Sequence, residues 1–196
     1  MQVRTARTAL KVLDIDVAAL AEDTLRVQAQ ALGMPPRALD HRIPERRARG
    51  ACELTALGAF EGGRLVGFAY GIAAREPYGW RGPVTATLQA AGRHAWAEDA
   101  FYLCEMHVLP AFQRRGLGTL LLTSLCERAT ERRVILTTPH RPTPARRLYH
   151  RHGYRDLAST GSAGSDAEPY AIMGAELPLR PAAVPATFSA FSTFAA

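Results

Sequence analysis

The spacing of apolar residues along the chain predicts alternating helices and strands. We expect helices where apolar positions share one helical face or lie between capping and breaking residues. These stretches are 16–32, 84–97, 115–131 and 143–154. Shorter, more continuous apolar runs predict strands over 2–6, 54–60, 65–73, 101–109, 133–138, 154–159 and 169–175. Asp16 is expected to cap the first helix, because its carboxylate can accept backbone hydrogen bonds there.

Turn and breaker residues organise these elements into one domain. Gly62 and Gly63 separate two apolar runs, which is a strong hairpin signal. The arginine-rich stretch 37–52 is broken by Pro44 and is expected to hold a helix fragment and a loop. The element order predicts an α/β fold on a single mixed sheet over residues 1–177. The Pro-, Ala-, Ser- and Phe-rich residues 178–196 are expected to form a loose tail.

Composition changes this picture little, but it narrows the class of protein. No apolar stretch approaches the roughly 18–20 residues that span a bilayer, and the first residues lack the apolar segment of a signal peptide. We therefore expect a cytoplasmic protein that does not bind membranes. The three cysteines show no metal-ligand spacing, so neither a disulfide framework nor a zinc site is expected.

The positive charge is concentrated in the second half of the chain. The whole sequence carries 24 Lys and Arg against 18 Asp and Glu, a net charge of +6. Residues 101–155 alone hold ten Arg against three Glu, a local balance of +7. Such a region favours an anionic partner. We do not expect nucleic acid, because the arginines lack interleaved aromatic residues and no helix-turn-helix pattern appears.

The stretch from 103 to 125 carries the most chemistry. A predicted strand leads through Pro110 to Gln-Arg-Arg-Gly-Leu-Gly at 113–118, and an apolar helix follows. Glycines at a helix start let backbone N–H groups converge on a phosphate, where the helix dipole adds to their attraction. A Walker A sequence is missing here, and the dinucleotide fingerprint fails because position 121 is Leu.

What remains, Q-x-x-G-x-G after a strand, resembles motif A of the GCN5-related N-acetyltransferase (GNAT) superfamily. Residues 133–157 are similar to the family's second motif, in which a strand leads to a helix with Ala145, Tyr149, Gly153 and Tyr154 at the matching positions. The resemblance implies a mostly antiparallel sheet of six to seven strands flanked by helices. One position departs from the pattern, because Pro142 stands where the family often has an Asn that contacts the cofactor.

The resemblance also implies a set of functional residues. Acetyl-CoA would be the acyl donor, its pyrophosphate held by backbone N–H groups of residues 114–119, here called the cradle. Tyr149 would protonate the departing thiolate. The cofactor-binding residues implied are the strand backbone of Met106, His107 and Val108 and the cradle residues Arg114, Arg115, Gly116, Leu117, Gly118 and Thr119.

Glu105 is the candidate general base. The attacking amine must lose a proton, and a charged residue in an otherwise apolar strand is expected to face a cavity or a partner of opposite charge. A structural ion pair with an arginine, or a role as an amine-binding anion, stays open. Strict alternation would place Leu103, Glu105 and His107 on one face of the strand. No metal is expected, because His150 and His152 lie two apart on a helix and are interpreted as solvated.

The predicted function is transfer of an acetyl group from acetyl-CoA to a primary amine by direct attack in a ternary complex, with a small-molecule amine favoured. A protein N-terminal or lysine acetyltransferase and a non-catalytic acyl-CoA-binding module are the alternatives, and a homodimer is left open. The family's amine groove would correspond to residues 33–52, 75–100 and 159–170, whose aromatic and acidic side chains suit a cationic amine: Tyr78, Trp80, Trp96, Glu45, Glu53, Glu76, Glu98, Asp99, Asp166 and Glu168.

Overall fold

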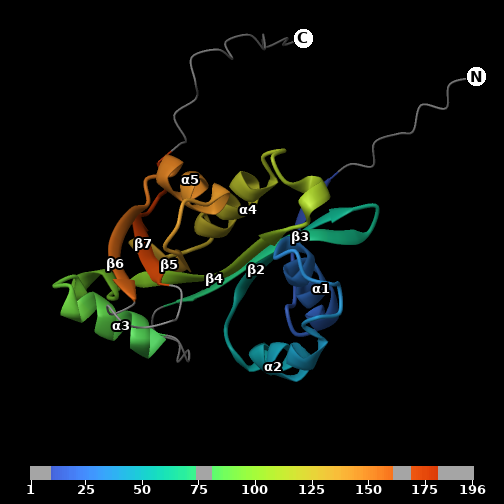
Figure 1. The fold of residues 1–196 in the computed structure, drawn as a ribbon, viewed down its shortest axis with the longest axis horizontal. Helices are drawn as coiled ribbons and strands as arrows, with labels where there is room; N and C mark the ends of the chain where they lie inside the picture. Colours follow the sequence, from blue (N-terminus) through green and yellow to red (C-terminus); the bar gives the residue numbers. More distant parts are fainter. Residues whose placement is uncertain (1–9, 74–80, 161–168, 181–196) are drawn as a thin grey trace, which may run out of the picture.

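The computed structural model describes residues 10–73, 81–160 and 169–180, and these form one seven-stranded sheet flanked by helices (Figure 1). The strands are β1 (Lys11–Asp14), β2 (Thr55–Glu61), β3 (Arg64–Ala73), β4 (Ala100–Val108), β5 (Arg133–Pro139), β6 (Arg155–Thr160) and β7 (Tyr170–Glu176). The helices are α1 (Ala21–Ala31), α2 (Ile43–Ala48), α3 (Arg81–Ala90), α4 (Leu117–Cys126) and α5 (Pro144–Arg151).

The sheet has the order β1-β2-β3-β4-β5-β7-β6, and every neighbouring pair is antiparallel except β4 with β5. This confirms the predicted mixed, mostly antiparallel sheet. The parallel pairing of β4 and β5 covers only Ala100–Tyr102 against Arg133–Ile135. Because β4 runs on to Val108 and β5 to Pro139, the two strands separate in the middle of the sheet. That separation leaves one side of β4 open for a ligand.

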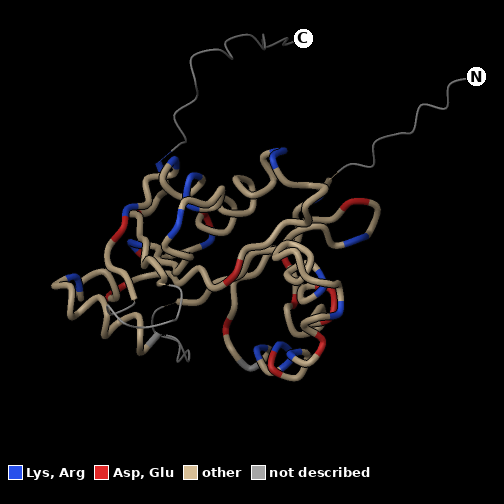
Figure 2. Tube along the Cα trace, viewed as in Figure 1, with Lys and Arg blue, Asp and Glu red and all other residues tan. Residues whose placement is uncertain are grey.

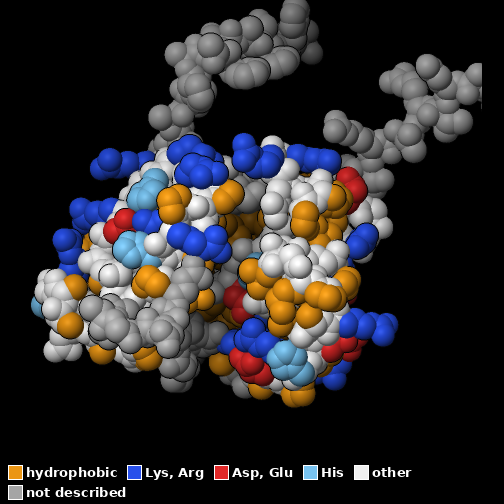
Figure 3. Space-filling view, viewed as in Figure 1, with side chains coloured by type: hydrophobic (Ala, Val, Ile, Leu, Met, Phe, Trp, Pro, Cys, Tyr) orange, Lys and Arg blue, Asp and Glu red, His pale blue; other side chains and the backbone are white. Residues whose placement is uncertain are grey.

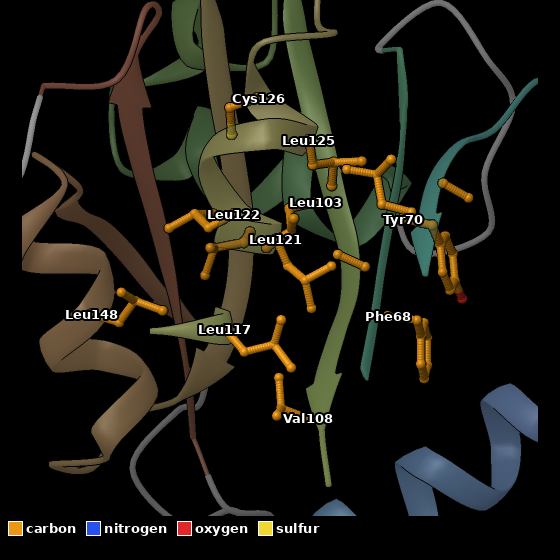
Figure 4. Packing of buried hydrophobic residues seen from close by; sticks show 14 of the residues in the cluster. Phe68, Tyr70, Leu103, Val108, Leu117, Leu121, Leu122, Leu125, Cys126 and Leu148 are labelled. Carbon is orange, nitrogen blue, oxygen red and sulfur yellow. The ribbon is translucent and has the colours of Figure 1, made fainter. Parts of the chain in front are cut away.

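Helices cover both faces of the sheet, with α4 and α5 on one face and α1, α2 and α3 on the other (Figure 1). On β3, the small residue Gly67 lies under α4, since a Cβ there would come within 3.3 Å of Leu121. The large residues Phe68 and Tyr70 point away from α4, as the sticks in Figure 4 show. The apolar face of α4 forms the centre of the main core, through its buried leucines Leu117, Leu121, Leu122 and Leu125.

The first helix and α3 differ from their predicted limits because local hydrogen bonds delay or end them. The first helix begins at Ala21, and the Asp16 carboxylate instead accepts hydrogen bonds from the backbone of Ala18 and Ala19, capping a preceding turn. Helix α3 ends at Ala90 rather than 97. There Gly92 adopts a φ of +67° and the Arg93 N–H reaches the Leu88 carbonyl at 2.7 Å, a glycine-based C-cap.

Helix α4 is also shorter than predicted, running from Leu117 to Cys126 rather than over 115–131. Beyond it, the N–H groups of Arg128 and Ala129 donate to carbonyls three residues earlier in the chain rather than four. These hydrogen bonds form a tighter 3₁₀-type turn, which ends the α-helix. The predicted strand at 2–6 lies outside the described residues, as does the tail from 181 onward. Within the part of the chain that is described, no helix is both long and apolar enough to cross a membrane.

A β-bulge in β4 corrects the predicted alternation. Gly71 of β3 opposes Leu103 and Tyr70 opposes Glu105, so Cys104 is an extra residue on β4. Directly opposed residues share a face, so Glu105 lies on the face of Tyr70 while Leu103 lies on the face of α4. The expectation that Leu103 and Glu105 share a face was therefore wrong, since a bulge resets the two-residue period. His107 does share the Glu105 face, because it opposes Phe68.

Candidate functional site

The cradle has the backbone geometry that an anion site at a helix start requires. Gly116, the residue before α4, has a φ of +83°, in the left-handed region that favours glycine. No side chain caps this end of α4, and its first turn holds no acidic residue. The N–H groups of the first helical turn therefore have no intrahelical acceptor. Arg114 and Arg115 are exposed beside them, so the cradle carries positive charge toward solvent.

Gln113, the first residue of the motif, fixes the position of the cradle relative to β4. Its side-chain amide donates a hydrogen bond to the Val108 carbonyl at 2.9 Å, joining the loop to the end of the strand. On the other side, Leu148 of α5 lies 3.5 Å from where a Cβ on Gly118 would be. Figure 3 shows basic side chains gathered over this α4 and α5 side of the molecule. The cradle is thus held from both sides, and it faces a cationic surface.

Glu105 is bound by a buried arginine that the sequence did not identify. Arg46 of α2 is only 2% exposed, and its Nη2 donates to the two carboxylate oxygens of Glu105 at 3.1 and 2.8 Å. The hydroxyl of Tyr70 donates to Oε1 at 2.8 Å. Arg46 also donates to Gln28 and lies over the rings of Phe68 and Tyr70, 5.7 and 5.4 Å from their centroids. Glu105 therefore has the arginine partner that its strand position called for.

His107 lies beside this ion pair. Its Nε2 is 3.7 Å from Glu105 Oε2, and its ring is 5.5 Å from that of Phe68. Burial lowers the pKa of His107 below its ordinary value, and Arg46 lowers it further, while Glu105 acts in the opposite direction. The imidazole is therefore neutral at neutral pH.

Tyr149 is buried on α5, and its ring packs against Tyr154 with centroids 5.4 Å apart. Tyr154 in turn contacts the buried thiol of Cys126 at 3.7 Å. Burial raises the pKa of the Tyr149 phenol, so the hydroxyl keeps its proton at neutral pH. A protonated hydroxyl is the state that an acid needs.

The histidines at the end of α5 do not behave alike. His150 is exposed and its Nδ1 is 3.1 Å from the Tyr154 carbonyl, whereas His152 is only 3% exposed. The interpretation of His152 as solvated was therefore wrong, because Arg180, beyond the last strand, lies against the turn at His152 and Gly153. Across the residues that the structure describes, no group of three His, Cys, Asp or Glu side chains is placed to hold a metal ion.

A cavity of about 770 Å³ opens beside Glu105 and is here called the central cavity. Its wall comes from Arg42 just before α2, from α2 and the residues after it, from the start of α3, from β4 and β5, and from the end of β6 and the start of β7. The hollow is visible on the face shown in Figure 3. Parts of all three segments predicted for an amine groove therefore line one cavity, next to the candidate base.

Among the described residues, few of the side chains predicted for the amine groove line the central cavity. Trp96 is buried in the core instead, where its ring atoms lie 2.9 Å from where a Cβ on Gly174 would be. Glu45 does line the cavity, but Glu53, Glu98 and Asp99 do not. The remaining predicted groove residues lie outside the described part of the chain: Tyr78, Glu76, Trp80, Asp166 and Glu168.

Glu45 is itself held by arginines. It accepts hydrogen bonds from Arg42 at 3.2 and 3.4 Å and from Arg49 at 3.1 Å. The hydrogen bond from Arg42 lowers the pKa of Glu45, although partial burial works against this. Figure 2 shows basic and acidic positions intermixed along α2. In the described part of its wall, the central cavity is therefore bordered by carboxylates that are paired with arginines.

Comparison with known proteins agrees with this geometry. The model of the acetyltransferase (GNAT) family matches residues 22–154. A curated relative, a GCN5-like protein acetyltransferase of Mycobacterium tuberculosis, is 36% identical over 123 residues. That match spans 59% of this chain and 60% of the relative, so the chain covers less than two thirds of the relative's length.

Solved structures share the fold at low sequence identity. A GNAT-family protein from Desulfovibrio desulfuricans aligns over 86% of this chain and 99% of its own, with a TM-score of 0.63 and 20% identity. The yncA protein of Salmonella typhimurium, solved with its cofactor acetyl-CoA, aligns over 86% of this chain and 94% of its own, with a TM-score of 0.59 and 20% identity.

Proposed function

The chain belongs to the acetyltransferase (GNAT) family, and we propose that it is an N-acetyltransferase that transfers the acetyl group of acetyl-CoA directly to a primary amine. The observation that carries this proposal lies along β4. The strand separates from β5 after Tyr102, carries Glu105 in its open part and leads to the uncapped start of α4. One strand thus connects a site for phosphate to a site for proton transfer.

The residues present fit acetyl-CoA. The free N–H groups of the cradle and its two arginines suit the pyrophosphate. The open side of β4, at Met106, His107 and Val108, offers backbone groups to the pantetheine amides. An N–H in this stretch also serves to polarise the thioester carbonyl. Holding thioester and amine together in this way supplies rate by proximity.

The reaction forms a bond from the amine nitrogen to the acetyl carbon and breaks the bond from that carbon to sulfur. The amine loses one proton and the sulfur gains one. In the proposal, Tyr149 gives its phenolic proton to the sulfur, because its buried hydroxyl is protonated at neutral pH. Glu105 takes the proton of the amine directly or through water, because it borders the central cavity.

A small-molecule acceptor suits the central cavity, whose volume of about 770 Å³ is that of a small-ligand site. A protein N-terminus or lysine is the second candidate, favoured by the name of the Mycobacterium tuberculosis relative. A panel of small amines and of peptides, assayed side by side for thiol release from acetyl-CoA, separates the two by their kcat/KM values.

The first experiment is calorimetric titration with acetyl-CoA, with desulfo-CoA and NAD as controls, on the wild type and on Gly118→Trp. Binding of both CoA compounds but not NAD, lost in the variant, is the expected result. Tyr149→Phe then tests catalysis: turnover falls while affinity for acetyl-CoA is kept. Binding with no turnover on any acceptor would instead favour a non-catalytic acyl-CoA-binding module.

The role of Glu105 is tested by Glu105→Gln. If Glu105 is the base, kcat falls and the acidic limb of the pH–rate profile changes. If Glu105 only binds the ammonium group, KM for the amine rises while kcat is kept.

A further inference from the structure

The two carboxylate oxygens of Glu105 are not equally occupied. Oε1 accepts from Arg46 at 3.1 Å and from the Tyr70 hydroxyl at 2.8 Å. Among the described residues, Oε2 accepts only from Arg46, at 2.8 Å. Each oxygen of a carboxylate offers about two acceptor sites, so Oε1 is filled and Oε2 keeps one site open. Oε2 is therefore the oxygen that can take a further hydrogen.

His107 is the nearest titratable group to Oε2, and it leaves that site open. Its Nε2 is 3.7 Å from Oε2, which is longer than a hydrogen bond. Because burial lowers the pKa of His107, the imidazole is neutral at neutral pH and does not form an ion pair with Glu105. Glu105 forms part of the wall of the central cavity, so the open site can serve a group bound there.

The two donors that bind Glu105 are themselves held in place. The Arg46 side chain is 2% exposed, donates to Gln28 at 2.8 Å and lies over the rings of Phe68 and Tyr70. Tyr70 is fully buried, and its ring stacks on Phe68 with centroids 6.2 Å apart. Because the donors come from two elements, α2 and β3, the carboxylate cannot rotate about its last bond without losing hydrogen bonds to both.

We infer that Arg46 and Tyr70 are positioning residues for the proposed acetyl transfer, which together occupy Oε1 of Glu105 and present Oε2 to the amine. One N–H bond of the ammonium group breaks and its proton bonds to Oε2. The nitrogen keeps the electron pair with which it attacks the acetyl carbon. Arg46 and Tyr70 keep their own protons. A carboxylate that is already oriented supplies rate, because it does not have to reorganise during the reaction.

This inference rests on the proposed function and names the residues that orient its base. Tyr70→Phe tests it, because the substitution removes the hydroxyl and keeps the ring that stacks on Phe68. We expect kcat to fall about tenfold, since a hydrogen bond to a charged group contributes at this level. KM for the amine and Kd for acetyl-CoA should not change, because the lost bond orients the base and binds neither substrate.

The same substitution in a Glu105→Gln protein separates positioning from a structural role. A positioning residue acts only through the carboxylate, so Tyr70→Phe should lower kcat by less than about twofold in that background. Arg46→Lys, which keeps the charge but loses the planar fork, should show the same contrast. Urea denaturation establishes which variants are folded, and Tyr70→Phe decides alone if Arg46→Lys is not.

Two substitutions serve as matched controls. Tyr102 is a second buried tyrosine of the sheet, and its hydroxyl is not among the described partners of Glu105. Tyr102→Phe should therefore keep kcat. Arg47 is on the same helix as Arg46, but it is 61% exposed and pairs with Glu22. Arg47→Lys should keep kcat as well.

The outcomes separate this inference from the proposed function. If Tyr70→Phe keeps the wild-type kcat, or lowers kcat equally with and without Glu105, acetyl transfer stands and the positioning role is overturned. A rise in KM for the amine at constant kcat would mean that the hydroxyl supports binding of the ammonium group, which also overturns it. If the wild type releases no thiol with any amine, the proposed function itself fails and this inference fails with it.

Discussion

The residue with the largest expected effect on stability is Arg46, because its charge is buried and its main partner is Glu105. Replacing one member of a buried ion pair leaves the other uncompensated. We expect Arg46→Met to lower the free energy of unfolding by about 3–5 kcal/mol, measured by urea denaturation. Arg46→Met combined with Glu105→Met should recover part of that loss, because no buried charge remains.

The neighbouring Arg47 provides the control for this prediction. Arg47 is on the same helix but is 61% exposed. Arg47→Met should therefore change the unfolding free energy by less than about 0.5 kcal/mol. Equal losses from the two substitutions would show that the Arg46 pair contributes nothing beyond helix packing.

The lowered pKa of His107 makes the stability of the fold depend on pH in a predictable direction. Burial lowers its pKa in the folded protein, so between that value and about 6.5 the unfolded chain binds more protons than the folded one. This contribution to stability is complete above about pH 6.5 and is lost as the pH falls through the depressed folded value. The slope from one such proton is at most about 1.4 kcal/mol per pH unit.

His107→Gln should remove that part of the acid-side loss, measured as unfolding free energy in urea at several pH values. The exposed His41 is the matched control, and His41→Gln should leave the profile unchanged. Glu105 and Arg46 face His107 and are present in all these proteins. An identical pH profile in the wild type and His107→Gln would contradict the prediction.

At the scale of an element, the two glycines of the cradle predict effects of opposite sign. Gly116 has a φ of +83°, so Gly116→Ala should cost about 1–2 kcal/mol. Gly118 is inside α4, and a Cβ there would make only an ordinary contact with Leu148 at 3.5 Å. Gly118→Ala should therefore stabilise the fold by about 0.5–1 kcal/mol, through helix propensity.

Urea midpoints of the two alanine variants check this contrast. Destabilisation of similar size in both would mean that the cradle needs glycine at each position for folding, which the described backbone does not support.

At the scale of the whole molecule, β4 and β5 are joined directly through only three residue pairs. A ligand that contacts both sides of the opening binds the folded protein and not the unfolded chain. Acetyl-CoA at a hundred times its Kd should thus raise the unfolding free energy by about 2.7 kcal/mol. Thermal unfolding with acetyl-CoA measures this. NAD should give no shift, and an equal shift with NAD would argue against a specific site.

The sequence alone predicted most of the local structure. The hairpin at β2 and β3, the strands β4 and β5 and the start of α4 at the cradle were all predicted close to their observed bounds. These features depend on short-range properties such as the freedom of Gly116 to adopt a positive φ. The end of α3 could have been predicted in the same way, because Gly92 is a glycine that can end a helix with a positive φ. The apolar pattern, which continues to residue 97, was followed instead.

The sequence by itself therefore determined most of the elements, although not β1 at Lys11–Asp14, together with the family pattern and the need of Glu105 for a partner. Only the tertiary structure decided which partner this is, because Arg46 lies 59 residues away and no local preference joins the two. It also decided the faces of β4, through one extra residue at Cys104, and the pairing of Glu45 with arginines. Pairing and register depend on contacts between distant segments, and such contacts set the charge of the central cavity.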